Sequence, residues 1–84
     1  MRVKICGITN IKDALLAESL GANAIGFIFH KKSKRYVLPE IATEIIKTLS
    51  PFTIKVGVFV NEEPEAINKI SSQIKLNVIQ LHGD

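Results

Sequence analysis

The stretch "NAIGFIFHKKSKRYVLPEIATEIIKTLSPFTIKVGVFV" (residues 23–60) decides the fold, because it places one helix pattern between two strand patterns. Residues 23–29 form a nearly unbroken apolar run, which is typical of a strand covered on both faces. Residues 40–49 carry apolar side chains at helical spacing, and Pro39 suits the first turn of that helix. Residues 53–60 are again rich in β-branched side chains. The stretch therefore predicts a strand–helix–strand unit.

The same alternation continues on both sides of this unit. Residues 2–6 ("RVKIC") and 76–81 ("LNVIQL") predict strands, and residues 10–22 and 61–74 predict helices. Asn10 is the predicted N-cap of the first helix. The apolar side chains expected on one face of that helix are Ile11, Ala14, Leu15 and Leu20. The predicted order of elements is βαβαβαβ.

Strands that alternate with helices of this length require parallel pairing, because right-handed crossovers are the common way to connect them. Two architectures fit, an open doubly wound sheet and a section of a closed barrel. No glycine-rich nucleotide-binding motif follows any predicted strand, which lowers the odds of a dinucleotide fold. "AIGFIF" and "KVGVFV" share a glycine followed by bulky apolar residues, a faint internal repeat.

Composition narrows the function classes. The chain has 84 residues and predicts a single small domain, residues 1–84. Its net charge of +3 is spread along the chain, which argues against a nucleic-acid interface. A single cysteine cannot form an internal disulfide, and this predicts a reducing cytoplasm. No apolar run approaches the length of a membrane span, and the N-terminus does not resemble a secretion signal.

Four polar side chains on the two outer predicted strands are candidates for chemistry. Residues two apart in a strand share a face, so Lys4 and Cys6 share one face, as do Gln80 and His82. The apolar residues between them are expected to meet the covering helices. Polar groups on the other face are costly unless they are paired or used. Cys6 and His82 also end their strands, where parallel α/β proteins place their sites.

Each candidate also has a structural interpretation. Cys6 can be an inert packing residue, and His82 can cap a turn. The loop "HKKSKRY" (residues 30–36) can be a solvated basic loop, although its Arg35 can grip a carboxylate with two hydrogen bonds. No spacing of His, Cys and Asp predicts a metal site. A Cys–His nucleophilic pair has no third group to orient it.

Four blocks of the chain carry a family resemblance. "VKICGIT", "GANAIGFIF" leading to "SKRYVLPE", "VGVFVNEEPE" and "NVIQLHGD" occur in the order seen in phosphoribosylanthranilate isomerase. The sequence resembles that family from Arg2 to Asp84. The resemblance implies a TIM-type (βα)₈ barrel, of which residues 1–84 are the N-terminal portion, with four strands and three helices. Barrels of this type need about 200 residues or more.

The resemblance implies an aldose–ketose isomerase of tryptophan biosynthesis. Its substrate is N-(5-phosphoribosyl)anthranilate, its reaction is an Amadori rearrangement, and it uses no metal or organic cofactor. By resemblance Cys6 is the general base, Arg35 binds substrate near the anthranilate carboxylate, and His82 and Gln80 line the pocket. The general acid and the phosphate-binding loops are expected beyond residue 84.

Two alternatives remain beside this interpretation. Another phosphoribosyl-handling barrel, such as the aminoimidazole carboxamide ribotide isomerase of histidine synthesis, uses a carboxylate at the end of strand one, so Cys6 argues against it. The second is a non-catalytic half-barrel whose exposed edges bind a copy of itself or a complementary C-terminal half. A four-stranded arc has two unpaired edges, so we expect the isolated piece to self-associate and to be inactive.

Overall fold

A computed structural model describes residues 2–82 as four strands that alternate with three helices. In chain order the elements are β1 (Lys4–Cys6), α1 (Ile11–Ser19), β2 (Ala24–Ile28), α2 (Pro39–Thr48), β3 (Ile54–Val60), α3 (Pro64–Gln73) and β4 (Val78–His82). The predicted βαβαβαβ order is confirmed. Residues 83 and 84 of the "QLHGD" block lie outside the described residues.

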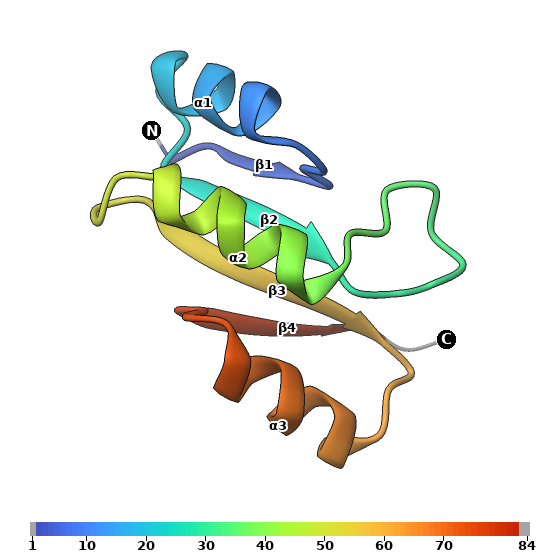
Figure 1. The fold of residues 1–84 in the computed structure, drawn as a ribbon. Helices are drawn as coiled ribbons and strands as arrows, with labels where there is room; N and C mark the ends of the chain where they lie inside the picture. Colours follow the sequence, from blue (N-terminus) through green and yellow to red (C-terminus); the bar gives the residue numbers. More distant parts are fainter. Residues whose placement is uncertain (1, 83–84) are drawn as a thin grey trace.

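The strand order separates the two architectures left open by the sequence. The sheet order is β1-β2-β3-β4, and every neighbouring pair is parallel (Figure 1). A doubly wound sheet reverses its direction of growth at a switch point, whereas a barrel adds each strand to the same side of the one before. The order observed here is that of a barrel section.

All three helices pack against one face of this sheet. The core cluster joins alanine and isoleucine side chains of α1 and α2 to alternate residues of the two central strands and the loop after β2: Ile25, Phe27, Phe29 and Phe59. Ile67 and Ile70 of α3 pack against the same cluster. The other side of the sheet carries no helix among residues 2–82, and we call it the open face.

Helix starts agree with the predicted caps only in part. Asn10 is the N-cap of α1, and its side-chain oxygen accepts a hydrogen bond of 2.8 Å from the Asp13 backbone N–H. The third helix begins later than predicted, at Pro64 instead of Asn61. Asn61 cannot be part of the helix because its φ is positive, at 49°. The short side chain of asparagine tolerates this left-handed conformation, which turns the chain after β3.

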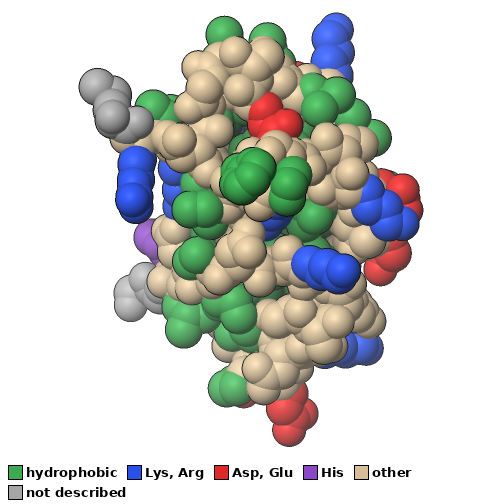
Figure 2. Space-filling model, turned by 90° about the vertical axis from the view of Figure 1, so that its left-hand side faces the viewer, with side chains coloured by type: hydrophobic (Ala, Val, Ile, Leu, Met, Phe, Trp, Pro, Cys, Tyr) green, Lys and Arg blue, Asp and Glu red, His purple; other side chains and the backbone are tan. Residues whose placement is uncertain are grey.

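The predicted apolar face of α1 was wrong in part. Its buried residues are Ala14 and Ala17, whereas Ile11, Leu15 and Leu20 are exposed. The reason is geometric, since α1 has a neighbouring helix on one side only and small side chains are what it presses onto the sheet. Figure 2 shows the end of the molecule at which the strands begin, with hydrophobic side chains at the surface there.

The faint repeat between "AIGFIF" and "KVGVFV" does not coincide with the sheet register. Gly26 pairs with Val56, and Phe27 pairs with Gly57, so the two glycines lie on opposite faces. A Cβ on Gly57 would meet Leu76 on the helix side, whereas one on Gly26 would meet Cys6. Gly57 therefore leaves room for Leu76 on the helix side of the sheet, and Gly26 leaves room for Cys6 on the open face.

Within residues 2–82 no further strand pairs with the outer side of β1 or of β4. All five residues of β4 are exposed, including Leu81 at 69%. A groove beside β1 is lined by Val3, Ile5 and side chains of α1, and a second groove lies between β4 and α3. No helix among residues 2–82 is long and apolar enough to cross a membrane.

Candidate active site

The Cys6 thiol lies on the open face, at the carboxyl end of β1. Cys6 pairs with Gly26, which alternates with the buried residues Ile25 and Phe27 and so points away from the helices. The sulfur lies 2.9 Å from the position that a Cβ on Gly26 would occupy. The parity predicted from the sequence, with the thiol away from the helical layer, is therefore present in the structure.

Lys4 and Gln80 meet across the open face. The Lys4 ammonium donates a hydrogen bond to the side-chain oxygen of Gln80, although the two residues belong to the opposite edge strands. In a flat sheet, strands three positions apart are separated by about 14 Å. Because the two side chains meet, the sheet curves around the open face as a barrel wall does, and Lys4, Cys6 and Gln80 line one concave surface.

Arg35 reaches the same end of the sheet from the loop between β2 and α2. This loop is held by short-range bonds: the Ser33 N–H donates to the His30 carbonyl at 2.9 Å, and the Arg35 N–H donates to the Ser33 hydroxyl at 3.1 Å. The arginine side chain lies over Gly7, whose missing Cβ would stand 2.5 Å from the Arg35 Cδ. Gly7 also has a φ of 87°, so two features favour glycine there. The structure thus brings Arg35 to the residue that follows Cys6, and both Cys6 and Arg35 line the groove between β1 and α1.

His82 ends β4 rather than opening a loop. It pairs with Val60, and its carbonyl accepts a hydrogen bond of 3.1 Å from the Asn61 N–H. By strand parity it shares the open face with Gln80. His82 is therefore at the same end of the sheet as Cys6 but on the far edge strand, so the two do not form an adjacent Cys–His pair.

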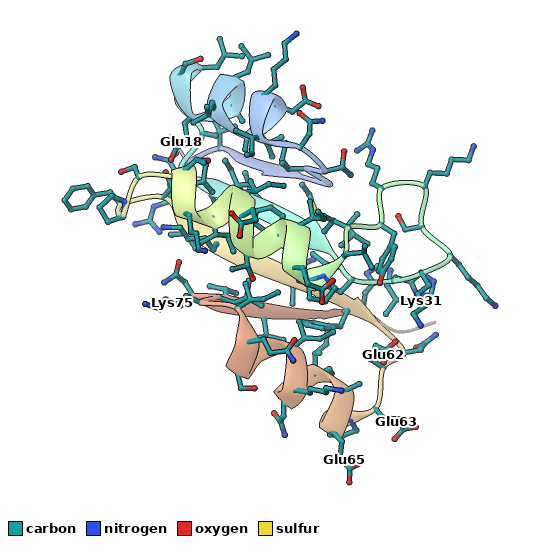
Figure 3. All side chains as sticks on the ribbon, viewed as in Figure 1. Glu18, Lys31, Glu62, Glu63, Glu65 and Lys75 are labelled. Atoms are coloured by element: carbon teal, nitrogen blue, oxygen red, sulfur yellow. The ribbon has the colours of Figure 1, made fainter. Side chains whose placement is uncertain are left out.

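The charges at this end are mixed and exposed. Lys31 in the β2–α2 loop and Glu62 in the β3–α3 loop both lie at the end where the strands finish, opposite to Glu18 (Figure 3). Arg35 is exposed, whereas Cys6 is partly covered. Among residues 2–82 no group of three His, Cys, Asp or Glu side chains could hold a metal ion. The arrangement offers a partly covered thiol near an exposed guanidinium, and a guanidinium can hold a carboxylate with two hydrogen bonds.

One contributor to the site went unnoticed in the sequence pattern. Gly26 lies directly opposite the thiol, whereas the repeat in "AIGFIF" gives it no role in the site. A glycine inside a strand often marks a place where another group approaches closely. That rule, applied to "AIGFIF", is the signal that could have found it.

A comparison with protein families finds one that covers almost the whole chain. The model for N-(5'phosphoribosyl)anthranilate (PRA) isomerase matches residues 3–84. Among curated proteins, the N-(5'-phosphoribosyl)anthranilate isomerase of Thermotoga maritima is 57% identical over 84 residues, which are 100% of this chain and 41% of that protein.

Solved structures agree with the sequence comparison. The crystal structure of phosphoribosyl anthranilate isomerase from Thermotoga maritima matches with a TM-score of 0.96 and 57% identity, over 100% of this chain and 41% of that one. A second crystal structure, of the isomerase in complex with reduced 1-(o-carboxyphenylamino)-1-deoxyribulose 5-phosphate, also gives 0.96 at 57% identity and is covered to 43%. The four strands and three helices thus match the N-terminal part of a TIM barrel.

Proposed function

The chain belongs to the family of N-(5'-phosphoribosyl)anthranilate isomerases, and from that premise we propose that it is the N-terminal portion of an isomerase of tryptophan biosynthesis. Its proposed substrate is N-(5-phosphoribosyl)anthranilate, and its product is 1-(2-carboxyphenylamino)-1-deoxyribulose 5-phosphate. The observation that carries the proposal is the Cys6 thiol, which ends β1 on the open face beside Arg35.

Cys6 is the proposed general base. Opening of the ribose ring gives a protonated imine at C1, which makes the proton on C2 acidic. The Cys6 thiolate removes that proton, and the electron pair of the C2–H bond forms the C1–C2 double bond of an enolamine. Return of a proton to C1 and loss of the proton on the C2 oxygen give the ketone. A free thiol persists in a reducing cytoplasm, which is the proposed location.

Arg35, His82 and Gln80 are the proposed substrate-binding residues. Arg35 extends over Gly7 to the end of β1, where its planar guanidinium can hold the anthranilate carboxylate with two hydrogen bonds. His82 and Gln80 line the opposite wall on β4. The bond from Lys4 keeps the Gln80 side chain directed across the cleft toward β1. The sugar would lie between Arg35 at the end of β1 and the side chains of His82 and Gln80 on β4.

The remaining parts of the site are proposed to come from a longer barrel. The chain spans 41–43% of the length of the curated relatives that it matches. We place the general acid and the phosphate-binding loops in the missing part, since such barrels bind phosphate after strands seven and eight. The open edges of β1 and β4 are where strands of that part would pair.

A second candidate is a half-barrel that acts as an interaction module. The observation that favours it is β4, whose five residues are all exposed with Ile79 at 42% and Leu81 at 69%. An unpaired strand edge with apolar side chains is a template for another chain. The module would bind a second copy or a complementary C-terminal half.

One experiment separates the two candidates. Residues 1–84 are joined to the part of the Thermotoga maritima isomerase that follows the matched region, and we call this fusion the completed barrel. We expect it to consume the fluorescent substrate at an enzyme-like rate. The two parts tested singly are the controls and should be inactive, because a base without acid and phosphate contacts loses most of its transition-state stabilisation. A folded but inactive completed barrel, with tight self-association of the 84-residue chain, would favour the module.

A further inference from the structure

We propose that Gly26 is a positioning residue for the reaction, because its missing side chain leaves the space on the open face in which the Cys6 thiol lies. This inference rests on the proposed role of Cys6 as the base. It concerns a residue of β2 that does not touch the reacting atoms itself.

The Cys6 side chain lies in the space over Gly26. The nearest heavy atoms to a Cβ built on Gly26 are the Cys6 Sγ at 2.9 Å and the Cys6 Cα and Cβ, both at 3.4 Å. Carbon atoms pack best at about 3.5–4.0 Å, and sulfur is larger than carbon. A methyl group on residue 26 would therefore force the sulfur to move by roughly 0.6–1.1 Å.

The backbone of Cys6 cannot yield easily. Cys6 is paired with Gly26 in the β1–β2 ladder, and the Gly26 carbonyl accepts bonds from the Gly7 N–H at 3.0 Å and the Ile8 N–H at 3.2 Å. These contacts hold the end of β1 against β2. The softest motion left is rotation about χ1 of Cys6, which carries the sulfur to another staggered position.

That rotation matters for a proton transfer. A general base must lie within hydrogen-bonding reach of the proton it removes. A displacement of about 1 Å can cost about 100-fold in rate. Arg35 lies over Gly7, whereas the three atoms nearest to the space over Gly26 all belong to Cys6, so substrate binding should be affected much less.

The test compares Gly26→Ala with the parent in the completed barrel. We expect kcat to fall by about 100-fold while KM changes by less than about twofold. The Hα–Hβ couplings of Cys6, measured by NMR, report its χ1 angle and do not depend on activity. We expect them to show that the Cys6 side chain of the variant adopts another rotamer. Gly57→Ala is the matched control, since it also adds a methyl group inside a strand but meets Leu76 on the helix side at 2.5 Å. It should lower the melting temperature and leave the Cys6 couplings unchanged.

The outcomes are distinguishable. An inactive parent would overturn the proposed function, while the couplings would still test the effect of Gly26. An active parent whose Gly26→Ala variant keeps both kcat and the Cys6 rotamer would overturn this inference and leave the function standing. If Gly26→Ala does not fold, Cys6→Ala is added to remove the sulfur. A folded double variant supports the inference, and an unfolded one contradicts it.

Discussion

Replacing Glu18 should destabilise the fold without touching the site. Glu18 lies in the last turn of α1, at the end where the strands begin (Figure 3). Its carboxylate oxygen Oε2 accepts a hydrogen bond of 2.8 Å from the Ser50 N–H and another from the Thr53 hydroxyl. Thr53 is buried, with 7% of its surface exposed. One carboxylate thus ties α1 to the segment before β3.

The expected loss follows from the two bonds. A hydrogen bond to a charged group contributes about 1.5–3 kcal/mol, and leaving a buried donor without a partner costs about 1–3 kcal/mol. Glu18 is itself only partly buried, so water can replace some of the lost contact. We therefore expect Glu18→Ala to lower the free energy of unfolding by about 2–4 kcal/mol. Glu18→Gln, which keeps an acceptor oxygen but loses the charge, should lie between the parent and Glu18→Ala.

Urea unfolding of the completed barrel measures this loss. Glu44→Ala is the control, because Glu44 is a helical glutamate whose bond of 3.4 Å to Lys47 is exposed. Exposed pairs of this kind contribute about 0.3–0.5 kcal/mol. The kcat of folded Glu18→Ala should equal that of the parent, since Glu18 and its two hydrogen-bond donors lie at the end of the sheet opposite to the site. If Glu18→Ala lowers the free energy of unfolding by no more than Glu44→Ala does, the two hydrogen bonds of Glu18 do not stabilise the fold to the expected extent.

Three further predictions concern the site and the edges. Cys6→Ala in the completed barrel should abolish turnover with little change in stability, and a kcat near that of the parent would remove Cys6 as the base. Arg35→Lys should raise KM more than it lowers kcat, because lysine loses the two-bond grip on a carboxylate; an unchanged KM would contradict this role. In sedimentation at micromolar concentration the 84-residue chain should associate through its open edges, and Leu81→Lys should weaken that association. A stable monomer would refute the edge argument.

Much of the local structure followed from side-chain periodicity. The spacing of apolar residues predicts helices and strands. The N-cap at Asn10 depends on a contact with Asp13, only three residues away. Strand parity likewise placed Cys6 and Lys4 on one face, because successive side chains in a strand point to opposite sides. These features depend on neighbours in the chain, so they could be predicted before any fold was known.

Contacts between distant segments could not be obtained in this way. The order β1-β2-β3-β4 selects a barrel section over a doubly wound sheet, and it depends on which edge each new strand joins. The meeting of Lys4 with Gln80, 76 residues apart, requires the curvature of the whole sheet.

The surroundings of the thiol show the same division. A glycine inside a strand often marks a close approach by another group, but only the β1–β2 register shows that the group facing Gly26 is Cys6. Packing also left Leu15 and Leu20 of α1 exposed where spacing predicted burial, since their cover depends on what lies beyond the edge of β1.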